Sequence, residues 1–227
     1  MDKNRLLQQI ANTIVSNLNG TEDVSLFHGK MGVCLFLYAY AMHTGKNYYE
    51  RMASRMFNDA CFADRKRMMS GVAEGYGGIG VGLCWLIQKG FIGGDAYNLL
   101  AEMDVLMIDN AEKCLRNDNL YAAPYFSSGV YLTWRRQLQG PPISEEIAKE
   151  IEETAYDKKD YAKQQIADFC SMDPDTLWWN FVLQNTEVRI SMEEIADAIQ
   201  LIHRNYVYEM SNINGQLSIL GLYLLNQ

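Results

Sequence analysis

Two side chains capable of proton transfer stand directly before glycines. His28 precedes Gly29, and Glu74 precedes Gly75. The imidazole of a histidine changes charge near neutral pH, and beside a carboxylate it can act as a general acid or base. We therefore name His28 and Glu74 as the candidate catalytic residues. The other interpretation of His28, and the commoner one for such a position, is that its ring caps a helix or bonds a backbone carbonyl.

Both residues belong to a motif that recurs along the chain, a Gly-rich loop followed by a helix that is apolar nearly all round. The clear copies are HGKMGV at 28–33, EGYGGI at 74–79 and NGQLSI at 214–219, and 126–132 is a degenerate copy. The leading glycines of the first two copies are 46 positions apart, and the third copy follows after about three such periods. A further degenerate copy is expected near 168. A repeat of this length is typical of helical-hairpin arrays.

The glycines of this motif have an architectural interpretation. A helix that is apolar on every side must be enclosed by other helices, and glycine lets loops approach one another closely at one end of a ring. Taken singly, each glycine is better explained by tight helix packing, and it is the repetition that favours the ring. We assign this structural role to Gly29, Gly32, Gly75, Gly77, Gly78 and Gly215. Their neighbours Lys30, Tyr76 and Gln216 are the candidates for contact with a partner.

Two other patterns contain residue types that often form functional sites, but here they do not indicate one. The five cysteines are spread along the chain without close pairs, which is typical of reduced thiols. Cys34 and Cys84 lie in apolar segments, so we expect them in the core, where burial suppresses thiol reactivity. The segment 75–80 has the spacing G-x-G-x-x-G, but no buried strand precedes it. Nucleotide binding is therefore not expected there.

Helices must position these residues, because apolar residues recur at helical spacing along nearly the whole chain and no stretch alternates as a strand does. The expected helices are 4–18, 31–44, 47–61, 78–89, 95–116, 125–139, 144–170, 174–185, 191–209 and 216–226. Their ends are marked by glycines, N-cap residues or prolines, as at Gly20, Gly45, Gly90, Asp95 and Gly140. The pattern predicts an all-α fold of about five hairpins in a single domain, residues 1–227.

Composition excludes several classes of protein. The net charge of −8 repels phosphate backbones and anionic lipid surfaces, so neither nucleic acid nor a membrane is an expected partner. The longest apolar run, 33–42, is about half of what a helix needs to cross a bilayer. The first twenty residues have helical spacing and lack the apolar block of a signal peptide, so we expect a cytoplasmic protein.

At the repeated loops the chain resembles the lanthionine synthetase C-like (LanC-like) family. The likeness is clearest in SLFHGKMGVCLFLYAYAMHTG at 25–45 and GVAEGYGGIGVGLCWLIQKGF at 71–91, and it returns in NINGQLSILGLYLLN at 212–226. The resemblance implies an α/α toroid, in which a Gly-x-x-Gly loop precedes each inner helix. It also implies peptide modification, because the family's cyclases add a peptide cysteine thiol to a dehydrated serine or threonine with the help of zinc.

The metal ligands that this resemblance implies are not found in the chain. The family holds zinc with two cysteines and a histidine, in a Trp-Cys loop and a Cys-His-Gly loop. Here Cys170 is followed by Ser171, and the segment 178–180 contains no thiol. A zinc site needs all of its donors to converge at about 2.0–2.3 Å. We therefore predict no metal ligands and no cofactor.

Length is the second departure from the family, whose ring of seven hairpins would need about 320 residues at this period. The chain has 227, so it predicts a shortened ring or an open arc. An open arc exposes apolar edges, so a homodimer is one expectation.

The leading interpretation is a non-cyclising LanC-like protein that binds a peptide or protein partner. Two alternatives stay open: an α/α-toroid enzyme (a cyclase, or a hydrolase or lyase using residues at the toroid mouth), and a structural helical scaffold.

Overall fold

The computed structural model describes residues 2–64, 68–116, 123–138, 149, 173–185, 188–205 and 213–227, and these residues are helical with no strand. The all-α prediction is thereby confirmed for the described part of the chain. The helices are α1 (Lys3–Asn17), α2 (Lys30–Thr44), α3 (Asn47–Cys61), α4 (Tyr76–Gln88), α5 (Ala96–Arg116), α6 (Ala123–Arg135), α8 (Pro174–Val182), α9 (Met192–Asn205) and α10 (Ile213–Leu225), with a 3₁₀ turn, η1 (Leu18–Gly20), after α1.

Most helices begin and end within a few residues of the predicted positions, because their end signals act locally. Gly45 ends α2 in the left-handed conformation, with φ of 68°, and its N–H donates to the Ala41 carbonyl at 2.8 Å. Gly90 adopts φ of 74° after α4. The Asp95 carboxylate accepts from the N–H of Tyr97 at 3.1 Å at the start of α5. Of the expected helix at 144–170 only residue 149 is described, and it is helical. The break at Gly140 and the degenerate copy near 168 lie outside the described residues.

Some of the glycines of the repeated Gly-rich loops lie inside the helices that follow the loops. Gly77 and Gly78 lie in the first turn of α4, and Gly215 lies in the first turn of α10. Gly32 likewise lies in the first turn of α2. The reason is that a helix can begin before a glycine when neighbouring residues supply the packing, and the glycine then provides close approach rather than a bend.

The chain divides into two compact units. Unit 1 comprises 1–63 and 167–227, and unit 2 comprises 64–166. The single-domain organisation expected from the sequence stays a prediction.

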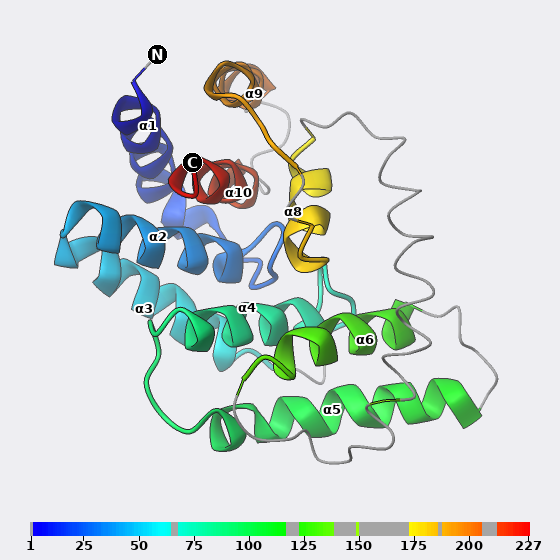
Figure 1. Ribbon diagram of the computed structural model, residues 1–227. Helices are drawn as coiled ribbons and strands as arrows, with labels where there is room; N and C mark the ends of the chain where they lie inside the picture. Colours follow the sequence, from blue (N-terminus) through cyan, green and yellow to red (C-terminus); the bar gives the residue numbers. More distant parts are fainter. Residues whose placement is uncertain are drawn as a thin grey trace. The chain divides into compact units, whose positions relative to one another are not determined.

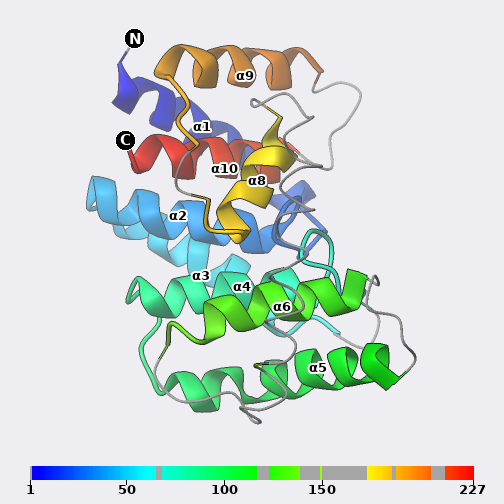
Figure 2. The same ribbon diagram turned by 45° about the vertical axis from the view of Figure 1, so that its right-hand side comes forward.

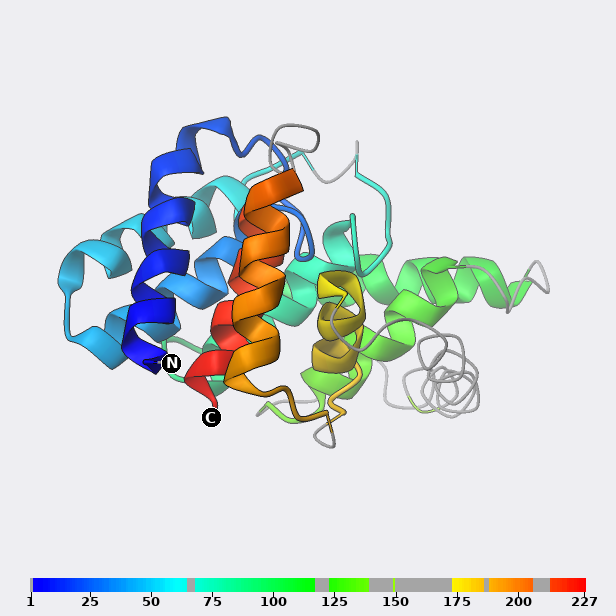
Figure 3. The same ribbon diagram turned by 90° about the horizontal axis from the view of Figure 1, so that it is seen from above.

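Unit 1 is built around α10, which packs against α1, α2, α8 and α9 (Figure 1). Seen from above, α9 runs along α10 with α1 beside them (Figure 3). Nearly every residue of α10 is buried, and so are Met31 to Tyr38 of α2, which α3 covers on another side. These are the helices whose sequence is apolar all round, and enclosure by neighbouring helices is what such a sequence requires.

Unit 2 contains α4, α5 and α6, with α6 packed against both of the others (Figure 2). Every residue of α4 from Tyr76 to Leu86 is buried. A fully buried polar network joins α5 to α6. In it, the Asp104 carboxylate accepts from the Tyr131 hydroxyl at 2.6 Å and from Arg135 Nε at 3.1 Å. Burial raises the pKa of Asp104, and the hydrogen bond from Tyr131 and the charge of Arg135 lower it in part.

No helix in the described ranges is both long enough and apolar enough to cross a membrane.

Candidate functional site

The candidate site begins with the segment 21–29, which leads into α2 and is called the His28 loop below. The loop folds back on itself through its backbone. Lys30 N–H donates to the Asp23 carbonyl at 2.9 Å, and Met31 N–H donates to the Ser25 carbonyl at 3.2 Å. The Asp23 carboxylate also accepts from Ser25 N–H at 2.6 Å. These bonds fix the position from which His28 projects.

The segment 68–75, called the Glu74 loop below, has the same geometry before α4. Tyr76 N–H donates to the Met69 carbonyl at 3.0 Å. This bond is equivalent to the one from Lys30 to Asp23 in the His28 loop, because donor and acceptor each lie 46 positions further along the chain. The glycines that follow His28 and Glu74 also match, with φ and ψ of −122° and −162° at Gly29 and of −127° and −174° at Gly75. The two clearest copies of the sequence repeat therefore share one backbone shape.

Space rather than backbone angle explains glycine in these loops, because the angles at Gly29 and Gly75 are open to other residues. A Cβ on Gly29 would lie 2.5 Å from Ser25 N, and a Cβ on Gly75 would lie 2.6 Å from Gly71 N, which is the equivalent atom. Each Cβ would also clash with the carbonyl oxygen that accepts the hydrogen bond of its own loop, which is that of Asp23 for Gly29 and that of Met69 for Gly75. A Cβ on Gly77 would lie 2.6 Å from the carbonyl oxygen of Ser70.

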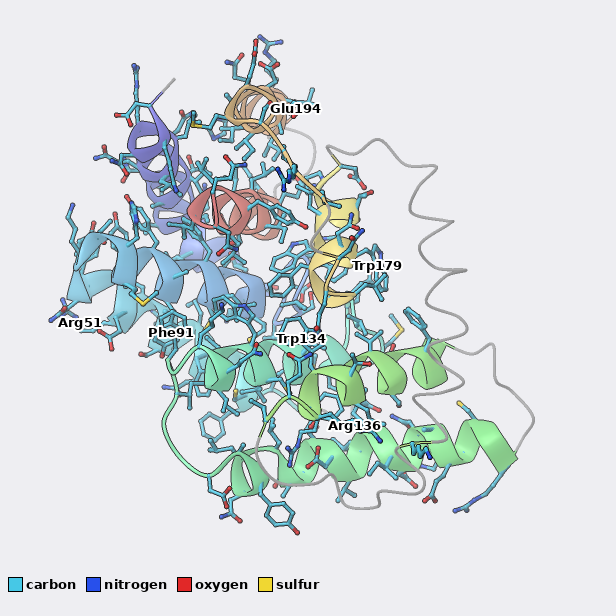
Figure 4. The ribbon with its side chains drawn as sticks, in the orientation of Figure 1. Arg51, Phe91, Trp134, Arg136, Trp179 and Glu194 are labelled. Atoms are coloured by element: carbon cyan, nitrogen blue, oxygen red, sulfur yellow. The ribbon has the colours of Figure 1, made fainter. Side chains whose placement is uncertain are left out.

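Helices α8 and α10 hold the His28 loop in place within unit 1. The fully buried indole of Trp178 donates from Nε1 to the Gly215 carbonyl at 3.2 Å and stacks on Phe27 with ring centroids 5.7 Å apart. A Cβ added to Gly32 would lie 2.7 Å from the Trp178 ring, so the indole occupies the space that a side chain at position 32 would need. Trp179, labelled on α8 in Figure 4, packs edge-on against Phe27 at 5.1 Å.

His28 faces a carboxylate of α8. Its Nδ1 lies 3.9 Å from Asp175 Oδ1, and the two side chains are 13% and 48% exposed. Nδ1 is buried and has no hydrogen-bond partner among the residues that the structure describes. The exposed part of the imidazole therefore lies away from Nδ1. The ring nitrogen that faces Asp175 is thus separated from solvent.

The predicted pair of His28 and Glu74 is divided between the two units, and its joint role stays a prediction. Glu74 is exposed and belongs to unit 2, whereas the carboxylate beside His28 in unit 1 belongs to Asp175. Sequence reasoning missed Asp175. It follows the N-cap residue Asp173, whose position before Pro174 signals a helix start, but no local pattern connects α8 with a histidine so far away in the chain.

The three candidates for partner contact differ in their surroundings. Lys30 forms an ion pair with Asp59, with 2.8 Å between Nζ and Oδ2. Tyr76 is buried, and its hydroxyl accepts a hydrogen bond from the Asn110 amide. Gln216 is half-buried and follows Gly215, on which a Cβ would lie 2.6 Å from His28 Cα. Gln216 is therefore the candidate whose chain neighbour, Gly215, packs against the His28 backbone from a distant helix.

No group of three or more His, Cys, Asp and Glu side chains is placed to hold a metal within the described ranges. Cys34 and Cys84 are buried as the sequence predicted, and burial raises the pKa of both thiols. Cys170, the only cysteine in the later part of the chain, lies outside the described residues. The absence of a cofactor stays a prediction.

Comparison with known proteins gives no match, whether with family models, with curated proteins or with solved structures. The likeness to the LanC-like family thus depends on the sequence motifs alone.

Proposed function

We propose that the chain is a non-cyclising LanC-like protein of the α/α-toroid type, as a shortened ring or an open arc, that binds a peptide or protein partner. The repeated loop supports this proposal, because Gly29 and Gly75 close two loops of one shape before two helices that are buried nearly all round. Repeats of this kind are the units from which helical-hairpin arrays are built.

The observation that carries the binding proposal is the meeting of three distant segments at the His28 loop. His28 lies beside Asp175 of α8, and the turn of α10 at Gly215 packs against the His28 backbone and bonds Trp178. Gln216 follows Gly215 in that turn. A preorganised backbone of this kind lowers the entropic cost of ordering a site when a ligand binds. The partly exposed ring of Trp179 on α8 supplies apolar contact area.

Cross-linking tests whether this region contacts the partner. The chain is expressed in its native cell with a photoreactive phenylalanine derivative in place of Gln216, and with the same group in place of the exposed Gln8 of α1 as a matched control. We expect one recurrent peptide or protein adduct from position 216 that position 8 does not give. His28→Ala should reduce the yield of that adduct severalfold. Equal adducts from both positions, or none from position 216, would contradict the proposal.

The absence of cyclisation is tested separately. The addition of a thiol to a dehydrated residue leaves the peptide mass unchanged but consumes the thiol. A peptide that contains dehydroalanine and cysteine is therefore incubated with the protein and then alkylated. We expect every cysteine to remain open to alkylation, and we expect protein purified without chelator to contain no stoichiometric zinc. Loss of alkylation together with bound zinc would identify an active cyclase.

A second function is favoured by the geometry at His28, whose buried Nδ1 faces a carboxylate while the side chain is 13% exposed. This arrangement suits a general base that a carboxylate orients. In this interpretation Asp175 takes the role predicted for Glu74. Turnover of an activated ester that His28→Gln and Asp175→Asn both abolish would favour the enzyme, and identical slow rates in all three proteins would exclude it for that substrate class.

The homodimer is the expectation for an open arc. Native mass measurement at micromolar concentration tests it directly, since a dimer supports the arc and a monomer at every concentration contradicts it.

A further inference from the structure

Helix α3 buries only a narrow face of its surface. Its buried residues are Tyr49, Ala53, Met56 and Ala60, which recur at intervals of three or four and therefore form one line along the helix. The helix that α3 packs against most is α2. All other residues of α3 are exposed or half-buried. Most of the helix surface is therefore open to contact with another molecule.

One flank of α3 carries a run of side chains that we call the α3 patch. Its five members follow one another at intervals of three, four or seven positions and so lie along one side of the helix: Tyr48, Arg51, Met52, Arg55 and Phe62. Phe62 belongs to this flank because its N–H donates to the Asn58 carbonyl at 3.0 Å, which extends the helical path to it. Tyr48 is 39% exposed and Phe62 is 86% exposed. Tyrosine, phenylalanine, methionine and arginine are the residue types enriched in protein interfaces.

The two arginines of the α3 patch carry charge that the rest of the described chain does not neutralise. Both are exposed, and neither forms a hydrogen bond or an ion pair with a described residue. Arg51, labelled in Figure 4, projects away from the helices. Asp59 lies four positions after Arg55, but its carboxylate is paired with Lys30 at 2.8 Å. Like charges four positions apart weaken a helix slightly, so helix stability does not explain the two arginines.

The charge of the α3 patch discriminates between the molecules that could cover it. The chain has a net charge of −8, which repels the phosphates of a nucleic acid over most of the surface. A symmetric dimer through the patch would bring the arginines of two copies together. A segment with carboxylates has the complementary charge, because a guanidinium holds a carboxylate with two parallel hydrogen bonds. The observations therefore favour an acidic peptide.

We propose that the α3 patch is a docking surface for an acidic peptide segment. Carboxylates of the segment bind Arg51 and Arg55, and its apolar side chains cover Tyr48, Met52 and Phe62. The distance along the helix from Tyr48 to Phe62 is about 21 Å, which is the length of a helix of about fourteen residues or of an extended segment of about six.

Docking at the α3 patch rests on the proposed function, to which it adds the chemistry of the partner and a second contact surface. The ion pair between Lys30 and Asp59 joins the last turn of α3 to the first turn of α2, which directly follows the His28 loop. One end of the patch therefore lies near that loop. A single peptide can contact both surfaces.

Three synthetic peptides probe the α3 patch directly. They share one amphipathic helical sequence and differ only at two positions four residues apart, where both residues are glutamate, both are glutamine or both are lysine. Each is titrated into the isotope-labelled full chain and followed by nuclear magnetic resonance. We expect the glutamate peptide to bind about tenfold more tightly than the glutamine peptide, as two exposed charge-assisted pairs allow. We expect its largest shifts in residues 48–62, and no binding of the lysine peptide.

Substitutions connect this preference to the two arginines. Arg51→Glu combined with Arg55→Glu should reverse it, so that the lysine peptide binds and the glutamate peptide does not. The matched control is Arg189→Glu combined with Arg204→Glu, which changes the net charge equally at two exposed positions before and on α9. This control should keep the preference for glutamate. Unchanged amide signals from α2 and α10 verify that both variants are folded.

Several outcomes would overturn docking at the α3 patch. They are no binding of the glutamate peptide, equal binding of the three peptides, a preference for glutamate that persists after both arginines are replaced, and shifts that lie outside α3. Single-stranded DNA is a further probe, and binding that shifts residues 48–62 as strongly as the glutamate peptide does would assign the patch to phosphates instead.

The cross-linking experiment at position 216 separates this proposal from the proposed function. A recurrent adduct from position 216, together with peptides that show no preference for glutamate, would retain the binding site at the His28 loop and contradict the α3 patch. A preference that reverses with the charge of positions 51 and 55, without an adduct from position 216, would retain the α3 patch and contradict the site at the His28 loop.

Discussion

At the scale of the residue, Gly32 lies where three segments of unit 1 meet. A Cβ at this position would press on the Leu26 carbonyl and lie 2.7 Å from the Trp178 ring. Gly32→Ala should therefore lower the free energy of unfolding by about 1–3 kcal/mol, as overpacking of a closed interior does. Gly20→Ala is the control, because nothing lies within 4 Å of the added Cβ. Urea unfolding measures both, and equal effects would show that the crowding at Gly32 relaxes freely.

The cysteines differ in burial, and this difference should decide their reactivity. Burial raises the pKa of the Cys34 and Cys84 thiols and also keeps reagents away, whereas Cys61 is only partly buried. At pH 8 we expect iodoacetamide to modify Cys61 at least tenfold faster than Cys34 or Cys84. Peptide mass mapping after timed labelling measures the three rates. Rapid labelling of Cys84 in the folded chain would mean that α4 opens to solvent.

At the scale of the element, α9 begins with a reciprocal cap. Ser191 N–H and its hydroxyl both donate to Glu194 at 2.8 Å, and Glu194 N–H donates back to the Ser191 hydroxyl at 3.2 Å. Glu194 is labelled on α9 in Figure 4. These bonds lower the pKa of Glu194, with the backbone bond from Ser191 as the main cause. The ionised side chain is therefore more favourable in the folded chain than in the unfolded chain.

The cap predicts a pH-dependent difference between the unaltered protein and Glu194→Gln. A lowered native pKa stabilises the fold above the unfolded value, and this stabilisation is lost as the pH falls through the native value. Glu194→Gln should therefore be the less stable protein at pH 6 to 7, and the difference should shrink as the pH falls below the ordinary titration range of a glutamate. Glu193→Gln, on the same turn, is the control. A difference that stays constant with pH would assign the effect to the helix rather than to the charge.

The helices could be predicted from the sequence where local chemistry decides their ends, as it does at Gly45 and Asp95. The starts of α4 and α10 were predicted two and three residues too late, at 78 and 216 instead of 76 and 213. The glycines in their first turns suggested loops, whereas in the structure the neighbouring carbonyls of Ser70 and Phe27 occupy the space that side chains would need. Which backbone approaches a glycine is a property of the tertiary fold and leaves no local signal.

At the scale of the whole molecule, unit 2 contains a charge pair, Arg135 with Asp104, in which both side chains are fully buried. Asp104→Asn leaves the buried Arg135 guanidinium without its carboxylate and should lower the free energy of unfolding by about 3–5 kcal/mol. Asp109→Asn, also on α5, removes an exposed pair with Lys113 and should cost about 0.5 kcal/mol or less. Hydrogen exchange should show the loss from Asp104→Asn to be largest in α4, α5 and α6. Uniform loss along the chain would show that the two units unfold together.

The candidate site was only partly predictable at this scale. His28 and its glycine could be recognised from their repeated spacing, and Gln216 from the closing repeat. Asp175 could not, because its nearness to His28 depends on how α8 packs against the loop through Trp178 and Phe27. The division into two units was also not foreseen, since no linker composition marks position 64.

The shared shape of the His28 and Glu74 loops has an evolutionary and a practical consequence. Their frames consist of backbone atoms and glycine, so the residue before the glycine can change from a base to an acid without altering the scaffold. A duplicated gene segment could thus acquire new chemistry by substitution at one position. For the same reason, positions 28 and 74 are places where a designer can graft a chosen side chain while the hydrogen-bonded frame of the loop stays in place.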